Sequence, residues 1–560
     1  MWCRPLVFLS VVALSRGASA PVVDTPAAPV VVTPLGKISG WESDWATPSG
    51  RAYQCWTKVP YAQPPVGSLR FKPPKPLEKW EGVLEATGEL PHCIQRGPDG
   101  QEDCLYLNIF RPKAVSMDRK LPVLFYVHGG AFQTGNSASP KFLADYFMSK
   151  DVVLVLIHYR LNGFGFVSLG DEVLPGNNGL KDQAMALKWV NENIEHFGGD
   201  PKIVTVFGTS AGGASAHYLL KSPLSEGFLA RAWSDSGSIN HVWSMMRTED
   251  AAANTRTLAN HFGCSMTGSE EIVECLQKID AQELMREIDR MTPKTMTLDC
   301  PFNPVIEPGN VEGAFMTEDL ALRPSTKPWV SSTTNGEYLL HLLMIDTLPD
   351  SYMDKIKQNV TGYLYDWVTR HTTDPHAISL GLYFVEGAYL FEKGSWTKYQ
   401  EDLPRAFAKM HGDNGFVYPA IYNMMIHQGP KWMYRFEYKG AGSIYMNPKT
   451  QEPYPDDVAP HASEGGFYFA YSHNELAPDR EITDRLVKYL TNFAIFGDPT
   501  PEGSPLQWEQ FTSPTDDTLM PKSGMETLKV TGKGDYMADS DFRENLYGIY
   551  WTWNTTIAWQ

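Results

Sequence analysis

Four short apolar runs recur along the chain, and none alternates between hydrophobic and polar positions. They are PVLFYV (122–127), VVLVLI (152–157), IVTVF (203–207) and PWVS (328–331). Runs that are apolar at successive positions and rich in β-branched or aromatic residues indicate strands buried on both faces. Such strands are typical of a mainly parallel sheet covered by helices.

A different periodicity separates the second and third runs. In segment 179–200 the apolar positions are spaced by three or four residues: Leu180, Ala184, Leu187, Val190, Ile194 and Phe197. This spacing predicts an amphipathic helix with one buried face, which Gly198 and Gly199 end. Strand, helix and strand in this order form a βαβ unit, so the predicted fold class is α/β.

Composition places the chain among ordinary globular proteins. It has 560 residues, of which 42% are hydrophobic and 20% charged, and this suffices for one large or two ordinary domains. The formal net charge of −17 disfavours nucleic acid or an anionic membrane as a partner. The sequence predicts no particular oligomeric state.

The N-terminal segment has the pattern of a secretory signal over residues 1–20. Arg4 is followed by an apolar run and then by Ala18-Ser-Ala20, a small-residue cleavage site. The run is too short to span a membrane, and the C-terminal residues carry neither a lipid-anchor tail nor a retention signal. We therefore predict a secreted protein without a membrane anchor, glycosylated at the sequons of Asn359 and Asn554. The proline-punctuated residues 21–34 are predicted to be an extended linker.

Cysteine usage agrees with export. Seven cysteines are present, and six remain once Cys3 is removed with the signal. The simplest pairings join neighbours in the sequence, Cys93 with Cys104 and Cys264 with Cys275. Each loop closure is expected to stabilise the fold by roughly 2–3 kcal/mol. Cys55 and Cys300 are left, and their pairing stays open. No spacing of cysteine and histidine suggests a metal site, and no cofactor is predicted.

The candidate nucleophile lies directly after the third apolar run. Gly208-Thr-Ser-Ala-Gly212 is a G-x-S-x-G motif between a predicted strand and a helix-compatible segment, the context of a nucleophile elbow. A plain glycine- and serine-rich turn is the alternative, but the flanking strand and helix favour the elbow. Ser210 is therefore the predicted nucleophile.

A second glycine-rich turn follows the first apolar run. His128-Gly-Gly-Ala-Phe132 leaves the backbone N–H groups of Gly130 and Ala131 free to converge with that of Ala211. Three such donors could stabilise an oxyanion, and the loss of one typically costs about 3 kcal/mol of transition-state stabilisation.

Longer motifs carry a family resemblance. They are EDCLYLN (102–108), HGGAF (128–132), NNGLKDQ (177–183), FGGDP (197–201) and FGTSAGGAS (207–215). Together they resemble the type-B carboxylesterase/cholinesterase family, and most of all its secreted arthropod esterases. The match runs from about residue 35 to nearly the end. The resemblance implies a single α/β-hydrolase domain over 35–556 and a catalytic triad in the order serine, acid, histidine.

The triad histidine of that family lies in a G-x-x-H-x-x-E pattern. His461-Ala-Ser-Glu464 matches it, although Val458 replaces the glycine. The alternative is His473, with His461 as an ordinary loop residue. The resemblance thus favours His461 as the general base.

The acid is harder to place, because the family usually has a glycine after it. Alignment on Pro328-Trp329-Val330 puts Glu337 in the register of the acid, and Tyr338 then replaces that glycine. Glu337 would orient the imidazole and stabilise the imidazolium. A glutamate in a surface loop is the alternative.

The resemblance also implies roles for residues outside the triad. Two ion pairs are expected to be structural, Arg70 with Glu102 and Arg160 with Asp182, since buried charges persist only when paired. Ser236 either supports the acid from behind or is an ordinary turn serine.

Substrate preference is indicated mainly by departures from relatives. Cholinesterases have Glu before the nucleophile and a choline-binding Trp in the first disulfide loop, whereas this chain has Thr209 and no Trp in 93–104. Juvenile hormone esterases usually have Gln at position 209. We therefore predict hydrolysis of small apolar carboxylic esters through an acyl-enzyme. The alternatives are a dedicated juvenile hormone or pheromone esterase, a lipase with a lid, and a catalytically silent adhesion protein.

Overall fold

The computed structural model describes residues 28–43, 50–97, 100–137, 144–369, 374–390, 402–440, 445–469, 477–512 and 526–539. The predicted signal, Asn554 and His473 lie outside these ranges. Among the described residues, no helix has both the length and the apolar character needed to cross a bilayer.

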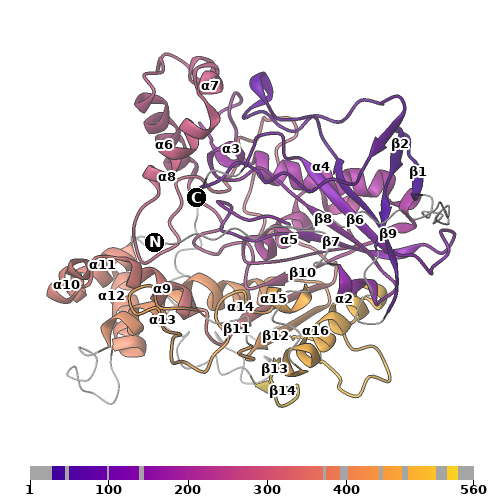
Figure 1. Ribbon diagram of the computed structural model, residues 1–560. Coiled ribbons are helices and arrows are strands. Elements are labelled where there is room, and N and C mark those ends of the chain that lie inside the picture. The colour runs from indigo at the N-terminus through magenta and orange to yellow at the C-terminus, as the bar shows by residue number, and fades with distance from the viewer. Residues whose placement is uncertain are drawn as a thin grey trace, which may run out of the picture.

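An eleven-stranded sheet forms the centre of the molecule (Figure 1). Its strands are β3 (Trp41–Glu42), β4 (Tyr53–Pro60), β6 (Tyr106–Pro112), β7 (Leu121–Val127), β8 (Val153–Ile157), β9 (Gly199–Thr209), β10 (Arg231–Asp235), β11 (Trp329–Thr334), β12 (Lys431–Phe436), β13 (Glu526–Val530) and β14 (Tyr536–Asp539). Their order is β14-β13-β12-β11-β10-β9-β7-β8-β6-β4-β3. The run from β8 to β13 is parallel, and the strands beyond it at both edges are antiparallel. The predicted α/β class with a mainly parallel sheet is confirmed.

Helices lie on both faces of this sheet, and further helices extend beyond it (Figure 1). They are α2 (Asp145–Met148), α3 (Asn162–Phe166), α4 (Asn178–Asn193), α5 (Ala211–Lys221), α6 (Thr248–His261), α7 (Ser269–Lys278), α8 (Ala281–Met291), α9 (Tyr338–Thr347), α10 (Asp350–Gln358), α11 (Val360–Thr369), α12 (Pro375–Val385), α13 (Leu403–Gly412), α14 (Tyr418–Ile426), α15 (Gly465–Tyr468) and α16 (Ala477–Phe496). Helices α6–α8 form a group at the upper left of Figure 1, and helices α10–α13 form a second group at the lower left.

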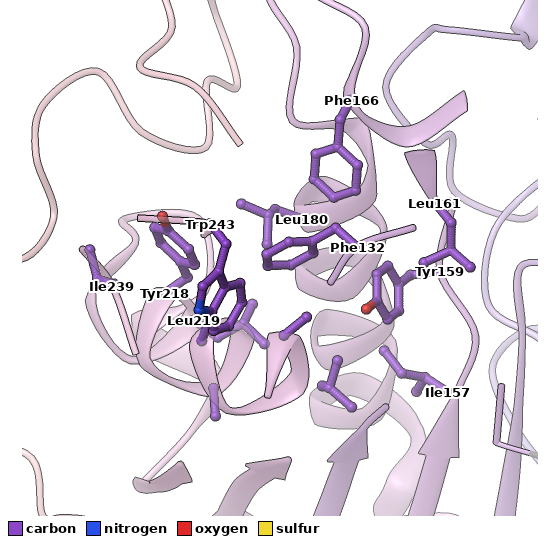
Figure 2. Packing of buried hydrophobic residues seen from close by; sticks show 14 of the residues in the cluster. Phe132, Ile157, Tyr159, Leu161, Phe166, Leu180, Tyr218, Leu219, Ile239 and Trp243 are labelled. Carbon is purple, nitrogen blue, oxygen red and sulfur yellow. The ribbon is translucent and has the colours of Figure 1, made fainter. Parts of the chain in front are cut away.

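The central strands explain why their sequences do not alternate. In β8, Val153, Val155 and Ile157 belong to the apolar core on one face of the sheet, whereas Leu154 and Leu156 belong to the core on the other face. Both faces are covered, so every position of the strand is apolar. On the first face, Phe132 after β7 lies near Leu180 of α4, and its ring meets that of Phe166 at 5.2 Å (Figure 2).

Helix α4 departs from the single buried face that its periodicity predicts. Lys181, Asp182 and Gln183 are buried as well. Lys181 forms an ion pair with Glu307, and Asp182 pairs with Arg160. Polar partners let the helix be enclosed on more than its apolar side, and hydropathy does not reveal such partners.

The segment predicted as a linker ends in a strand. Within 21–34, β1 (Val30–Val32) pairs with β2 (Lys37–Ser39), which in turn pairs with β5 (Val83–Glu85) in a small three-stranded sheet. Val31 is buried, while Val30 and Val32 are exposed. The strand propensity of three consecutive valines therefore outweighs the surrounding prolines in this short segment.

Two disulfides are present, Cys93–Cys104 and Cys264–Cys275, the pairings that proximity in the sequence favours. Cys55 and Cys300 are both free thiols. Cys55 is buried within β4, and the Cys300 sulfur lies near the carbonyl oxygen of Ala131.

Candidate active site

The serine of the G-x-S-x-G motif lies between β9 and α5. Its backbone has φ 59° and ψ −124°, a conformation that is costly for a residue with a side chain and is tolerated where the surroundings enforce it. The Ser210 N–H donates to the carbonyl of Asp235 at 2.7 Å, and its own carbonyl accepts from the Ala214 N–H at 2.9 Å. These hydrogen bonds hold the sharp turn.

The two glycines of the motif are required by close backbone approach. A Cβ on Gly212 would lie 2.0 Å from the carbonyl oxygen of Val127. A Cβ on Gly208 would lie 2.4 Å from the same oxygen. Any side chain at either position would push β7 away from the turn that carries Ser210.

Ser210, His461 and Glu337 form one hydrogen-bonded chain. The Ser210 Oγ lies 3.0 Å from His461 Nε2, and His461 Nδ1 lies 2.6 Å from Glu337 Oε2. A carboxylate can only accept, so Nδ1 carries the hydrogen and Nε2 accepts from the serine hydroxyl. His461 is 6% exposed and Glu337 2% exposed, so water does not compete for the contact between these two side chains.

The loops that carry the acid and the histidine are joined to each other. Glu337 lies between β11 and α9, and Gly336 forms a parallel bridge with Pro460, next to His461. On its other side, the His461 ring packs on Phe416 with ring centroids 4.2 Å apart. The imidazole is therefore fixed by both backbone pairing and ring packing.

The two departures from the family pattern are accommodated near this bridge. The hydroxyl of Tyr338 donates to Asp456 Oδ1 at 2.6 Å. A Cβ on Gly412 would lie 2.7 Å from the Tyr338 Cα, so a glycine on α13 provides the close approach. Val458 packs beside Gly336. Neither replacement displaces the acid.

A buried polar network lies behind Glu337. Ser236 Oγ is 2.7 Å from Glu337 Oε1 and 2.8 Å from Glu464 Oε1. The Thr334 N–H also donates to Glu337 Oε1, at 2.8 Å. Ser236 thus supports the acid. Glu464 is the last residue of the His461-Ala-Ser-Glu464 motif. The sequence analysis predicts no role for it.

Two hydroxyls, those of Ser236 and Ser332, serve four carboxyl contacts in this network. The Ser236 hydroxyl has one hydrogen for two carboxyl contacts. When it donates to Glu337, a proton on Glu464 supplies the other contact. Burial, reinforced by the nearby carboxylates of Asp235 and Glu337, raises the pKa of Glu464 well above its usual value. Burial therefore favours the neutral form of Glu464.

A third buried carboxyl closes the network. Asp235 Oδ1 accepts from Trp233 Nε1 at 2.7 Å, from the Tyr434 hydroxyl at 2.7 Å and from Ser332 Oγ at 3.1 Å. Burial raises the pKa of Asp235 to about 6, and these donors oppose the rise. Ser332 also contacts Glu464 at 3.0 Å, so the two carboxyls are linked through one hydroxyl.

The second glycine-rich turn lies against the serine. Gly130 has φ 116° and Ala131 φ 53°, and a Cβ on Gly130 would lie 2.1 Å from the Thr134 carbonyl oxygen. Gly130, Ala131, Ser210 and His461 line one cavity of about 710 Å³. Ala211 begins α5, whose first N–H groups have no partner within the helix. All three predicted oxyanion donors thus belong to the turns that meet at Ser210.

The two expected ion pairs are present and lie away from the serine. The Arg70 guanidinium donates two hydrogen bonds to the Glu102 carboxylate, of 2.6 and 2.7 Å. The Arg160 guanidinium donates two to the Asp182 carboxylate, of 2.7 and 2.6 Å. Each guanidinium also donates to backbone carbonyls. The two ion pairs therefore connect separate segments of the chain and have a structural role. Within the described ranges, no group of three or more His, Cys, Asp and Glu side chains is arranged to hold a metal ion.

A mostly parallel sheet that presents a serine on a strand–turn–helix, with an acid and a histidine following in that chain order, defines an α/β-hydrolase. Residues 27–533 match the Carboxylesterase family. The chain is 34% identical over 533 residues to a juvenile hormone esterase of Tribolium castaneum, covering 86% of each chain. It is 40% identical over 442 residues to venom carboxylesterase-6 of Apis mellifera, covering 74% of this chain and 76% of the other. It is 30% identical over 519 residues to a cholinesterase of Mus musculus, covering 86% and 81%.

The chain belongs to the carboxylesterase family and is a carboxylic-ester hydrolase.

Proposed function

We propose that this protein hydrolyses small apolar carboxylic esters through a covalent acyl-enzyme on Ser210. The observation that carries the proposal is the continuous hydrogen-bonded chain from Ser210 Oγ through His461 to Glu337, with contacts of 3.0 and 2.6 Å. An isolated serine hydroxyl is a weak nucleophile, and this arrangement provides the adjacent base that activates it.

In the first half of the reaction, Ser210 Oγ attacks the ester carbonyl carbon while His461 Nε2 takes the hydroxyl proton. The C=O bond becomes a C–O⁻ single bond, and the N–H groups of Gly130, Ala131 and Ala211 donate to that oxyanion. The intermediate then collapses, the bond to the alcohol oxygen breaks, and His461 returns the proton to that oxygen.

In the second half, a water molecule takes the place of the alcohol. His461 removes one of its protons as the water oxygen attacks the acyl carbon, and Ser210 leaves with that proton. Glu337 keeps Nδ1 protonated throughout and stabilises the imidazolium. None of these steps needs a cofactor.

Two features support a broad preference for uncharged esters: the apolar wall of the cavity around Ser210 and the residue Thr209 before it. Leu298, Leu340 and Met285 supply apolar wall around Ser210, which suits an uncharged ester. Thr209 stands where cholinesterases have Glu, so nothing at this position attracts a choline cation. One relative is named a juvenile hormone esterase and another a venom carboxylesterase; we favour a general carboxylesterase over either narrow specificity.

We also propose that the protein is secreted and glycosylated at Asn359. The pattern of residues 1–20 and two disulfides support export. Asn359 is exposed at the end of α10, where an oligosaccharide would meet no neighbour from the core.

A fluorophosphonate probe tests the nucleophile, because it reacts only with an activated serine. We expect stoichiometric labelling of the purified protein and a single modified peptide that contains Ser210, with no labelling of Ser210→Ala. Modification of a different serine, or labelling that persists in Ser210→Ala, would refute the assignment.

A further inference from the structure

The turn that carries two of the predicted oxyanion donors is closed by its own backbone. The N–H groups of Gln133 and Thr134 both donate to the carbonyl oxygen of Gly130, at 2.9 and 3.0 Å. Gly135 follows directly and returns close to the start of the turn, where a Cβ on it would lie 2.3 Å from the carbonyl oxygen of Gly129. The position of the backbone at Gly135 is therefore coupled to that of Gly130.

The side chain of Gln95 pairs with both backbone groups of Gly135. Gln95 Oε1 accepts from the Gly135 N–H at 2.9 Å, and Gln95 Nε2 donates to the Gly135 carbonyl oxygen at 3.0 Å. Nε2 uses its second hydrogen on the carbonyl oxygen of Cys93, at 3.1 Å. Both donors of this amide are thus occupied. Among the described residues, those that line the Ser210 cavity include Arg96 but not Gln95.

The residue before Gln95 connects to the same turn through Asn162. Asn162 is completely buried. Its N–H donates to the carbonyl oxygen of Phe132 at 2.7 Å, and its Nδ2 donates to the carbonyl oxygen of Ile94 at 3.1 Å. The segment 94–95 therefore holds the turn at two points, one directly after Ala131 and one at Gly135.

The loop that carries Gln95 is itself firmly held. The Cys93–Cys104 disulfide closes it, and Ile94 and Gln101 pair across it through a backbone hydrogen bond of 3.1 Å. The ion pair of Arg70 with Glu102 fixes its far side. A catalytic group is held precisely only when the residues that support it are held as well. This loop meets that condition for the turn that contains Gly130 and Ala131.

We infer that Gln95 is a positioning residue for the oxyanion hole. The inference rests on the proposed function, in which the N–H groups of Gly130 and Ala131 donate to the oxyanion. Gln95 touches neither the ester nor the reacting atoms, and it acts through Gly135. Hydrogen bonds weaken steeply as their angle departs from linear, so a small displacement of the turn reduces the stabilisation that the two donors give to the transition state.

Gln95→Met tests the inference, because methionine has a similar length and volume but cannot pair with Gly135. Steady-state hydrolysis of 4-nitrophenyl acetate gives kcat and KM, and titration of Ser210 to completion with a fluorophosphonate ensures that misfolded protein is not counted. We expect kcat and kcat/KM to fall together by at least about fivefold, with KM little changed. The fall should be smaller than the roughly 10²- to 10³-fold that follows outright loss of one donor.

A transition-state analogue separates positioning from a general loosening of the fold. An alkyl trifluoromethyl ketone adds to the nucleophilic serine and forms an oxyanion, whereas the matching methyl ketone binds without reacting. In Gln95→Met we expect the inhibition constant of the trifluoromethyl ketone to rise by about the same factor as kcat/KM falls. The inhibition constant of the methyl ketone should stay unchanged, because it makes no oxyanion.

Gln282→Ala is the matched control. Gln282, on α8, donates to the carbonyl oxygen of Gly100 at 3.4 Å, so it is an amide contact to the same loop at a point away from Gly135. Its turnover should stay within about twofold of the parent. If Gln95→Met gives too little folded protein, Gln95→Glu replaces it: its carboxylate accepts from the Gly135 N–H but cannot donate to the Gly135 carbonyl, and the same loss is expected.

Three results would overturn the inference: turnover of the Gln95 variant within about twofold of the parent, an equal fall in Gln282→Ala, or inhibition constants that change alike for the two ketones. Failure of the proposed function is seen separately, in the parent protein. It would show as an absence of both ester turnover and fluorophosphonate labelling at Ser210, before any variant is compared.

Discussion

Replacement of Ser236 by alanine should impair turnover even though Ser236 does not touch Ser210 or His461. Its hydroxyl donates to Glu337 Oε1 at 2.7 Å and is completely buried. In Ser236→Ala the Thr334 N–H and His461 remain as donors to Glu337, but one donor to the carboxylate is lost and no water can replace it.

The size of the effect follows from the charge on the acceptor. A hydrogen bond to an ionised group contributes about 1.5–3 kcal/mol. If this energy holds the acid in position for the imidazolium-forming step, its loss lowers kcat by roughly 10- to 150-fold, because about 1.4 kcal/mol corresponds to a factor of ten. The fall should remain smaller than the roughly 10⁴-fold expected when the acid itself is disabled.

Steady-state hydrolysis of 4-nitrophenyl acetate measures both kinetic parameters. We expect kcat to fall and KM to change little, since the hydroxyl lies behind the acid and away from the ester. Ser332→Ala is the control: Ser332 Oγ contacts Asp235 and Glu464, and no contact joins it to Glu337. Ser236→Gly tests strain, because Ser236 has φ 49° and glycine relieves it. A kcat within twofold of the parent, or an equal fall in Ser332→Ala, would refute the reasoning.

Two further predictions concern the buried carboxyls. Glu337→Gln should lower kcat by roughly 10⁴-fold while leaving detectable turnover, because the amide cannot hold the protonated Nδ1 as the carboxylate does; unchanged turnover would place the acid elsewhere. Burial raises the pKa of Glu464 and that of Asp235, the latter to about 6, so above about pH 4 the folded protein keeps protons that the unfolded chain releases. The free energy of unfolding should therefore fall as pH rises from about 4 through 6. Glutamine at position 464 binds no proton, so in Glu464→Gln the free energy of unfolding, measured by denaturant titration, should fall less as pH rises. A pH dependence equal to that of the parent protein would contradict the raised pKa of Glu464.

The sequence motif around Ser210 identified the nucleophile because the sharp turn that carries it restricts which residues can stand next to it. The glycines at 208 and 212 are dictated by the approach of Val127, and the strand before Ser210 is recognisable from its continuous apolar run. The family fold and ester hydrolysis were predicted from long motifs and are confirmed. The positions of His461 and Glu337 beside Ser210 rest on pairing between distant loops, and only the family resemblance indicated them.

The network behind the acid could not be predicted in the same way. In the sequence, Glu464 is a polar residue of a loop. Its raised pKa results from enclosure by two other chain segments, one with Asp235 and Ser236 and one with Ser332. The strand at Val30–Val32 was missed because three residues between prolines carry too little periodicity to identify. Burial of the polar side of α4 likewise depends on partners far away in the sequence.

Hydrolysis of 4-nitrophenyl acetate by the purified protein and by Ser210→Ala tests the central claim most directly. We expect the parent protein to turn over the ester, to carry one acetyl group on Ser210 when quenched during turnover, and to lose steady-state turnover in the variant. Turnover that persists at the parental rate in a folded Ser210→Ala protein would contradict the acyl-enzyme mechanism.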